Sequence, residues 1–309
     1  MRVRFVGLML FALVFAARAQ GPEPQFTVQT DIQYCTGGGV PLLMDVFIPT
    51  HRNSTPTPAV LWIHGGGWAM GDKNGNSGAK FLANEGFVTA SLSYRLSGES
   101  PFPAAIEDCK CAIRFLRKNA LNYGINSDRI GVAGSSAGGH LAELVATTSP
   151  NAGLEGAGGW QNVSSKVQAA ASYYGVSDFT AQFPRETDQF IEKFLRGTES
   201  EKAQLYRKAS PIFYVSKDDP PLLIVHGDKD DVVPFEQSTR MIEAYRRIGL
   251  SVEFIAVLNS GHDFEQIGSA PISPSVEIIH QRTVDFFKRH LISVPATANR
   301  SEGAFSETR

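Results

Sequence analysis

The sequence predicts an α/β fold in which helices flank a doubly wound, mostly parallel sheet. Short apolar runs alternate along the chain with amphipathic helical segments, and most of these runs are apolar throughout. Strands that helices cover on both faces are apolar on both faces, and regular strand–helix alternation builds parallel sheets. The length of 309 residues, 42% of them hydrophobic, is enough for one large α/β domain or two small ones.

The first 19 residues have the layout of a secretory signal peptide. Arg2 and Arg4 precede an apolar run over residues 5–16, and residues 17–19 form a small-x-small cleavage site. A run of about a dozen apolar residues is short for a membrane span. We therefore expect cleavage after Ala19 and export of the mature chain to the periplasm or the medium.

The strands and helices of the main domain are expected within residues 25–292. Two runs at 31–34 and 42–49 fit antiparallel edge strands before the parallel part of the sheet. Six further runs are predicted as strands: 59–64, 86–94, 129–134, 168–175, 221–227 and 252–257. Helical spacing of apolar residues predicts helices over 103–124, 236–249 and 275–291.

Two segments depart from this alternation. Residues 176–220 are long, mixed and partly helical, and they lie between two predicted strands. We expect them to form a small cap over one end of the sheet, with a lateral insertion as the alternative. Residues 293–309 contain few large apolar side chains, which predicts a disordered tail.

Charge and composition narrow the classes of partner. The chain has 29 basic and 31 acidic residues and no basic patch, so nucleic acid is not an expected partner. After the leader no stretch is apolar and long enough to span a membrane. The sequence leaves the oligomeric state open.

Three cysteines, Cys35, Cys109 and Cys111, leave at least one thiol unpaired within a monomer. An exported chain can form a disulfide, and Cys35 could pair with either of the others. As metal ligands the three lack a usable set of partners. The simplest interpretation is that they are small buried residues.

The string GSSAG at 134–138 follows a predicted strand and begins a predicted helix. In that context the pattern G-x-S-x-G is typical of a nucleophile elbow, a tight turn that exposes a serine hydroxyl. Only Ser136 has glycine two residues before and two residues after it, so spacing selects Ser136 over Ser135. A glycine-rich turn with incidental serines is the alternative.

A serine hydroxyl needs a general base. In this architecture the base follows a late strand, and His262 in NSGHDF does so. His140 falls one turn into the helix behind Ser136, where its ring would point away from the hydroxyl, so we expect a structural role. His226 ends a predicted strand and is expected to orient the loop that follows.

The imidazole needs a carboxylate to hold one tautomer. The loop HGDKDDVVP at 226–234 offers Asp228, Asp230 and Asp231, which spacing alone does not separate. A solvated or cation-binding loop is the alternative for three clustered acids.

Three consecutive glycines in HGGGW, His64 to Trp68, directly follow a predicted strand. Backbone N–H groups there can approach a substrate without obstruction, and this motif supplies oxyanion donors together with the N–H after the nucleophile. We assign Gly66, Gly67 and Ala137 as the candidate donors and His64 as the residue that fixes the loop. Trp68 and Phe102 are candidate lining residues of a substrate pocket, with ordinary core packing as the alternative.

Together these motifs resemble an α/β-hydrolase esterase of the HGGG-carrying, hormone-sensitive-lipase-like group, and more narrowly its bacterial feruloyl-esterase-like branch. The resemblance covers roughly residues 30–290. It is carried by six strings: VLWIHGGGW, SLSYRLS, FPAAIEDCKCAIRFLR, RIGVAGSSAGGHLA, PPLLIVHGDKDDVVPFEQS and SGHDF.

The resemblance implies the α/β-hydrolase fold and a carboxylic ester hydrolase that uses a Ser136–His262–Asp230 triad. In that family the acid lies four residues after the histidine of HGxxDxxVP, which selects Asp230. The implied reaction passes through an acyl-enzyme and uses no organic cofactor and no metal ion. Acetyl or feruloyl esters of plant cell-wall polysaccharide are the substrates suggested by analogy.

Two other functional classes remain as alternatives. A serine exopeptidase or amidase can use the same triad, although no separate peptide-gripping domain is present in the sequence. A non-catalytic binding protein on this scaffold should lack a triad residue or the glycine loop, and here both are present. A dehalogenase is excluded because the elbow carries serine where that chemistry requires aspartate.

Overall fold

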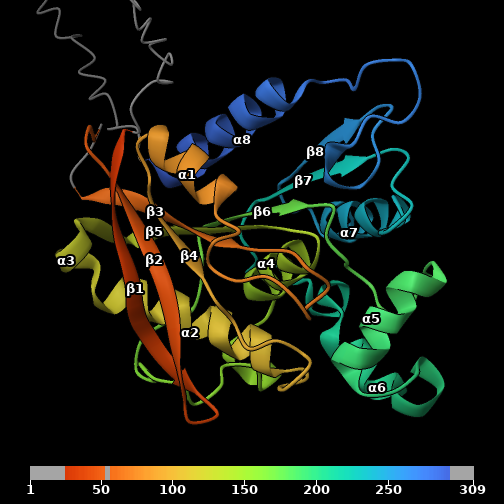
Figure 1. Cartoon of the computed structure of the whole chain (residues 1–309), viewed down its shortest axis with the longest axis horizontal. Helices are drawn as coiled ribbons and strands as arrows, with labels where there is room; N and C mark the ends of the chain where they lie inside the picture. The colour runs from red at the N-terminus through yellow and green to blue at the C-terminus, as the bar shows by residue number, and fades with distance from the viewer. Residues whose placement is uncertain (1–24, 53–55, 293–309) are drawn as a thin grey trace, which may run out of the picture.

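One eight-stranded sheet organises the chain in the order β1-β2-β4-β3-β5-β6-β7-β8 (Figure 1). The computed structural model describes residues 25–52 and 56–292. The predicted signal peptide at 1–19 and the predicted tail at 293–309 lie outside these described residues. The strands are β1 (Phe26–Gly37), β2 (Val40–Pro49), β3 (Thr57–Ile63), β4 (Val88–Leu92), β5 (Ile125–Ser135), β6 (Ala169–Tyr173), β7 (Leu222–Gly227) and β8 (Val252–Val257).

Strand direction divides the sheet into two parts. The β1–β2 hairpin is antiparallel and joins the rest through antiparallel pairing of β2 with β4. From β4 to β8 every neighbouring pair is parallel. All residues of β3, β4, β6 and β7 are buried, as strands between two helical layers should be. The predicted doubly wound sheet with antiparallel edge strands is confirmed.

Helices cover both faces of the sheet (Figure 1). One face packs against α1 and α8, and the other packs against α2, α3, α4 and α7. Two helices, α5 and α6, come from the segment 176–220. The bounds are α1 (Ser77–Asn84), α2 (Ala104–Lys118), α3 (Ala120–Tyr123), α4 (Ala137–Thr147), α5 (Arg185–Leu195), α6 (Glu199–Ala209), α7 (Glu236–Arg247) and α8 (Val276–Leu291), with short 3-10 turns at Pro150–Ala152, Pro211–Tyr214 and His262–Phe264.

The single helix predicted over 103–124 is two helices. The chain leaves helical geometry at Asn119 and resumes as the one-turn α3, which ends on Gly124 in the left-handed conformation that glycine tolerates. Helix α1 was not predicted, because its eight residues SGAKFLAN include few large apolar side chains.

The α5–α6 segment lies at the end of the sheet where the parallel strands finish (Figure 1). Buried Ile191, Phe194 and Leu195 of α5 join the core on the α2 and α4 side. Thr187 at the start of α5 donates a hydrogen bond of 2.7 Å to the carbonyl of Val232 in the loop after β7. The segment therefore packs as a small two-helix cap beside the loops that follow β3 and β7.

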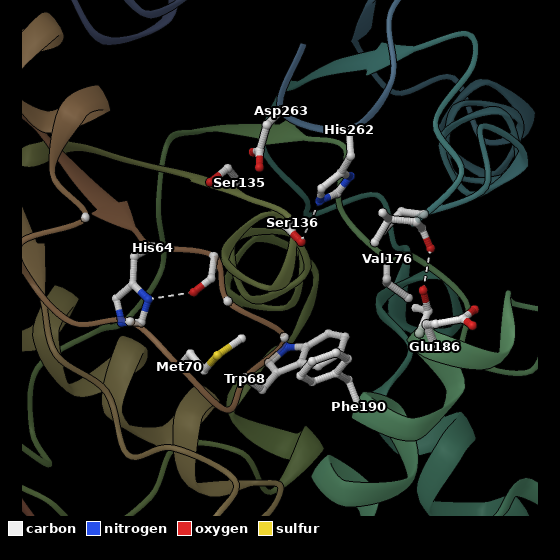
Figure 2. Close-up of a pocket in the computed structure, with 18 of the residues that line it drawn as sticks. His64, Trp68, Met70, Ser135, Ser136, Val176, Glu186, Phe190, His262 and Asp263 are labelled. Carbon is white, nitrogen blue, oxygen red and sulfur yellow. Dashed lines mark hydrogen bonds between the residues drawn. The ribbon is translucent and has the colours of Figure 1, made fainter. Parts of the chain in front are cut away.

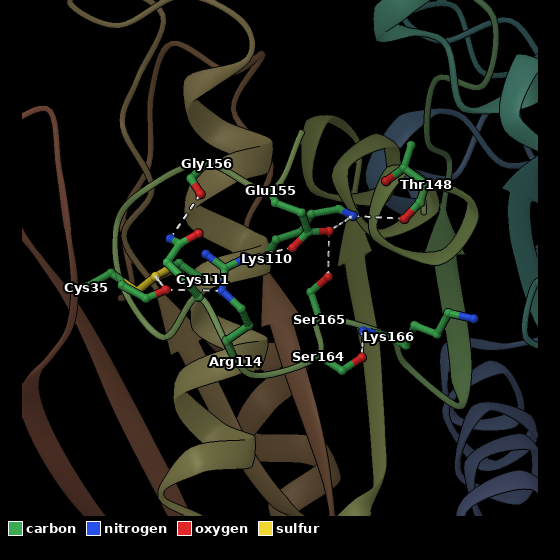
Figure 3. Close-up of polar contacts among 12 residues, drawn as sticks. Cys35, Lys110, Cys111, Arg114, Thr148, Glu155, Gly156, Ser164, Ser165 and Lys166 are labelled. Carbon is green, nitrogen blue, oxygen red and sulfur yellow. Dashed lines mark hydrogen bonds and ion pairs between the residues drawn. A yellow bond between two sulfur atoms is a disulfide. The ribbon is translucent and has the colours of Figure 1, made fainter. Parts of the chain in front are cut away.

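A disulfide joins Cys35 of β1 to Cys111 of α2, and Cys109 is a buried free thiol (Figure 3). All three cysteines are buried, as interpreted from the sequence, and of the two pairings left open for Cys35 the structure has the one with Cys111. Packing of α2 against β1 brings these two residues, 76 apart in sequence, to a Cα–Cα distance of 6.4 Å. Cys109 points in a different direction on the helix, toward the sheet.

The loop after α4 is fixed on α2 next to this disulfide (Figure 3). The buried Lys110 ammonium and Arg114 guanidinium each lie 2.7 Å from a different oxygen of Glu155. Arg114 Nε donates to the carbonyl of Gly159 at 3.2 Å, and the disulfide sulfur of Cys111 lies 3.6 Å from the same oxygen. Among the helices of the described residues, none has the length and apolarity needed to cross a bilayer.

Candidate active site

Ser136 lies between the last residue of β5 and the first residue of α4, with backbone angles φ 54° and ψ −119°. A non-glycine residue rarely adopts this conformation, so the surrounding turn must impose it. A Cβ on Gly138 would lie 2.1 Å from the carbonyl oxygen of Ile63, and a Cβ on Gly134 would lie 2.4 Å from that of Gly138. The two flanking glycines therefore let the helix pass close to the strands and leave the Ser136 hydroxyl at a pocket wall.

His262 points toward this hydroxyl from the loop after β8 (Figure 2). Its Nε2 lies 3.1 Å from Ser136 Oγ, and its Nδ1 lies 2.7 Å from Asp230 Oδ2. The His262 ring also packs against the ring of Tyr174, at 4.6 Å between centroids, and the Tyr174 hydroxyl donates to Asp263 in the same loop. The structure thus brings together three residues that are 32 and 126 positions apart in sequence.

The Asp230 carboxylate is fully buried and accepts four hydrogen bonds. Its Oδ2 accepts from His262 and His226, and its Oδ1 accepts from the backbone N–H groups of Val232 and Val233. Burial raises the pKa of Asp230, but the hydrogen bonds from His226 and His262 outweigh burial and hold this pKa well below its ordinary range. Asp230 is therefore an anion that faces the His262 ring.

The other two acids of this loop take different positions. Asp231 is exposed and lines the pocket, and within the described residues no hydrogen bond joins it to His262. The Asp228 carboxylate accepts from the backbone N–H of Ser260 at 3.3 Å. Geometry thus separates three carboxylates that spacing alone leaves equivalent.

The glycine loop after β3 passes directly beside Ser136. A Cβ on Gly65 would lie 3.3 Å from the Ser136 Cβ. Within residues 25–52 and 56–292, the backbone N–H groups of Gly66, Gly67 and Ala137 donate no hydrogen bond. Three unpaired donors next to one hydroxyl can stabilise negative charge that develops there.

His64 begins this loop and stabilises its path. Its Nδ1 donates to the carbonyl of Gly65 at 2.7 Å, and its ring stacks on Tyr94 with 4.2 Å between centroids. Burial lowers the pKa of His64. The ring is therefore a neutral structural group under the loop.

Trp68 and His140 lie beneath the loop as a pair. Trp68 is 2% exposed, its ring stacks on Phe194, and its indole N–H donates to His140 Nδ1 at 3.0 Å. His140 Nε2 donates to the carbonyl of Ala209 at 2.8 Å, and burial lowers the pKa of His140 to about 3. Trp68 contributes to the pocket floor mainly as a buried support that links the glycine loop to the cap.

Phe102 does not lie in the wall of this pocket. It is 5% exposed, packs edge-on against Phe194 of α5 and is not among the residues that line the cavity. Its aromatic character suggested substrate contact, but the cap covers it.

The pocket encloses about 770 Å³ and contains Ser136 and His262 in its wall (Figure 2). Its apolar lining includes three side chains that the sequence analysis did not single out: Met70, Val176 and Phe190. Phe190 is 37% exposed on α5, and a Cβ on Gly67 would lie 2.7 Å from its ring. The sequence signal that could have predicted this part of the wall is that Phe190 is a large aromatic residue outside the buried face of the amphipathic helix α5.

The charged side chains around the cavity are acidic: Glu186, Asp231 and Asp263 line it with His64 and His262. No group of three or more His, Cys, Asp or Glu side chains in the described part of the chain is arranged to hold a metal ion. The arrangement can perform general-base activation of a hydroxyl, with an anion behind the base and backbone donors in front of the hydroxyl.

Comparisons with known proteins place this geometry in a family. The chain is similar to esterase LipQ of Mycobacterium tuberculosis, with 34% identity over 252 residues that cover 79% of this chain and 59% of the relative. It spans about three fifths of the length of the curated relatives that it matches.

Two solved structures have the same architecture. One is a truncated carbohydrate esterase from gut microbiota, with 28% identity, a TM-score of 0.74, and coverage of 89% of this chain and 100% of that chain. The other is a bifunctional GH43-CE protein of Bacteroides eggerthii, with 29% identity, a TM-score of 0.72, and coverage of 85% and 38%. The BD-FAE family model matches residues 44–245, from β2 into α7 and well over half of the sequence. This chain belongs to the BD-FAE family.

Proposed function

We propose that this protein is a serine carboxylic ester hydrolase. The observation that carries the proposal is the continuous chain of contacts from Ser136 Oγ through His262 to the buried Asp230, at a pocket wall that also presents unpaired backbone N–H groups. Membership of the BD-FAE family and the names of the relatives support it.

The proposed reaction has two steps. His262 Nε2 takes the proton of Ser136 Oγ as that oxygen bonds to the ester carbonyl carbon, and the N–H groups of Gly66, Gly67 and Ala137 stabilise the resulting oxyanion. When the intermediate collapses, the carbon–alkoxy bond breaks and the alcohol leaves with the proton from His262. Water then attacks the acyl-enzyme with His262 as its base, and the acid is released while the proton returns to Ser136.

Asp230 has an electrostatic role in both steps. It accepts the Nδ1–H of His262, so that Nε2 is the free acceptor, and it stabilises the imidazolium that forms during each transfer. The Asp231 carboxylate is exposed, so its charge would act on the His262 ring only through solvent.

We further propose acetyl or feruloyl esters of plant cell-wall polysaccharide as the substrate class. The two solved neighbours are titled as a carbohydrate esterase and a GH43-CE protein, which supports a carbohydrate ester for this chain. A cavity of about 770 Å³ with Met70, Val176 and Phe190 in its wall is compatible with an aromatic acyl group.

Export of the mature chain is also proposed. The leader pattern at residues 1–19 is its basis, and the Cys35–Cys111 disulfide supports it because disulfides persist in oxidising compartments. Fractionation of the producing cell with N-terminal sequencing tests this. A mature chain that begins at Gln20 outside the cytoplasm is expected, whereas an uncleaved cytoplasmic chain contradicts export.

Hydrolysis of p-nitrophenyl acetate by wild type, Ser136→Ala and Ser135→Ala tests the reaction. We expect Ser136→Ala to lose at least about 10³-fold in kcat and Ser135→Ala, which loses the same atom one residue earlier, to retain most activity. Equal hydrolysis by wild type and Ser136→Ala contradicts the serine mechanism, and no hydrolysis by wild type favours a binding protein. Acetyl, butyryl and feruloyl esters, xylan fragments and a p-nitroanilide panel then separate esterase from amidase.

A further inference from the structure

His226 contacts the acid of the proposed triad at Oδ2, the same oxygen that binds His262. It is the penultimate residue of β7 and has no solvent exposure. Its Nε2 lies 3.1 Å from Asp230 Oδ2 and 2.9 Å from the carbonyl oxygen of Val233, and its Nδ1 lies 2.6 Å from Ser238 Oγ on α7. Every polar atom of the ring therefore has a partner.

These partners determine where the ring carries its proton. A carboxylate oxygen and a carbonyl oxygen both accept, so Nε2 must carry a hydrogen shared between Asp230 and Val233. The Ser238 hydroxyl can donate to Nδ1, which makes the neutral Nε2–H tautomer fully satisfied. In this tautomer His226 is a fixed N–H donor to Asp230 and offers no basic nitrogen to the pocket.

We propose that His226 is a positioning residue for the reaction, in which its Nε2–H holds the Asp230 carboxylate in place and withdraws negative charge from the oxygen that binds His262. This inference rests on the proposed hydrolase function. It assigns His226 a role three hydrogen bonds away from Ser136 Oγ, through Asp230 and His262.

The physical argument concerns the one oxygen that the two histidines share. Asp230 Oδ2 accepts from both rings, while Oδ1 is occupied by the N–H groups of Val232 and Val233. If the His226 donor is removed, Oδ2 keeps more charge for His262 and loses its fixed direction. The first change makes His262 more basic, and the second weakens the alignment of its ring.

Several other groups face the pair and must stay constant in the test. The Tyr174 ring lies against His262, and its hydroxyl binds Asp263. Asp231, Glu186 and His64 line the same cavity. Substitutions confined to position 226 leave all of these groups in place, so a difference between variants at that position reports the contact to Asp230.

Two amides provide the sharpest test, because each can replace one nitrogen of the ring. In His226→Gln the amide nitrogen can reach the position of Nε2 and donate to Asp230. In His226→Asn the shorter amide reaches only the position of Nδ1, so it keeps the Ser238 contact and loses the Asp230 contact. The two variants differ by one methylene group and share the same polarity.

The measurement is the pH profile of kcat/KM for p-nitrophenyl acetate, with thermal unfolding in parallel. We expect His226→Asn to lose roughly tenfold in kcat/KM, and its acidic limb to move to higher pH by about half a unit. We expect His226→Gln to keep a limb close to that of wild type. Ser238→Ala, which removes the partner on the other side of the ring, should lower the unfolding temperature without moving the limb.

An unmoved limb in folded His226→Asn overturns the proposal, and so does an equal displacement in His226→Asn and His226→Gln. If His226→Asn does not fold, His226→Gln decides alone: a limb like that of wild type supports the N–H donor role, and a displaced limb overturns it. Full activity of Ser136→Ala would instead overturn the proposed function, so the two failures are distinguishable.

Discussion

The two halves of the candidate site are built by different means. The half after β3 and β5 consists of backbone: the N–H groups of Gly66, Gly67 and Ala137, with Ser136 on a strained turn. The half after β7 and β8 consists of side chains, with Asp230 and His262 held by hydrogen bonds. A fully buried histidine supports each half. His140 binds Trp68 beneath the glycine loop of the first half, and His226 binds Asp230 of the second.

The difference shows how each half can be disturbed. The backbone half depends on the absence of side chains, so a single added methyl group can close it. The side-chain half depends on the charge of one carboxylate, so a substitution that keeps the shape and removes the charge can disable it. The two supports differ accordingly: the partners of His140 are uncharged, whereas His226 faces an anion.

The side-chain half should give the largest effect. In Asp230→Asn the shape is kept, but the buried anion that stabilises the His262 imidazolium is lost and the amide can bind the wrong tautomer. We expect a loss of about 10³–10⁴-fold in kcat. Steady-state kinetics on p-nitrophenyl acetate checks this, with Asp231→Asn as the matched control one residue later. A larger loss from Asp231→Asn would transfer the acid role to that residue.

A substitution in the backbone half should cause the next largest loss of activity. Gly66 has φ 104°, and a Cβ there would lie 2.4 Å from the carbonyl oxygen of Met70, so Gly66→Ala must displace the loop. We expect a loss of about 10²–10³-fold in kcat, which corresponds to one lost oxyanion donor.

Gly67→Ala is the matched control for the glycine loop. Its added Cβ would meet the ring of Phe190, a partly exposed side chain that can move, so we expect a loss below about tenfold. If Gly66→Ala and Gly67→Ala behave alike, the loop does not present its donors in the way that these contacts indicate.

Local pattern and topology explain which features the sequence could predict. The strands covered on both faces were visible because all their residues are apolar, and the positions of Ser136 and the glycine loop followed from small residues directly after strands. Selecting Asp230 from three carboxylates required the family pattern, because its burial arises only when the loops after β7 and β8 meet. The Cys35–Cys111 disulfide and the Phe190 wall also depend on contacts between elements distant in sequence, which periodicity does not report.

Substitution of His140, the buried histidine beneath the backbone half, should have a smaller effect on activity and should change how the free energy of unfolding depends on pH. His140→Phe leaves the Trp68 indole N–H and the Ala209 carbonyl without partners, so we expect roughly a tenfold loss in kcat/KM. Because folding lowers the His140 pKa from 6.5 to about 3, this group stabilises the fold above pH 6.5, and that contribution is lost as the pH falls toward 3.

Urea unfolding at pH 7.5 and 4.5 measures this contribution. Wild type should lose about 2–3 kcal/mol through His140 over that interval, and His140→Phe should lack this part of the decline. His51→Phe, a substitution of an exposed histidine outside the pocket, is the control and should decline as wild type does. An equal decline in His140→Phe and wild type would contradict a neutral, buried His140.

The smallest effect on activity is expected at the disulfide, which touches neither half. The Cys35–Cys111 bridge closes a separation of 76 residues between α2 and β1, the edge strand of the sheet. Replacing both cysteines by alanine should lower the free energy of unfolding by about 2–4 kcal/mol, because the unfolded chain regains the entropy of the open loop. kcat should stay within about twofold of wild type, since neither Cys35 nor Cys111 lines the pocket.

Cys109→Ala provides the comparison for the disulfide variant, because it removes a buried thiol from the same helix without opening a loop. We expect it to cost about 1 kcal/mol and to respond to dithiothreitol as wild type does, whereas the double alanine variant should no longer respond. A loss of kcat in the double variant at temperatures where it remains folded would mean that the hairpin and α2 transmit strain to the elbow. In that case the hairpin and α2 would support the active site in addition to the two buried histidines, His140 and His226.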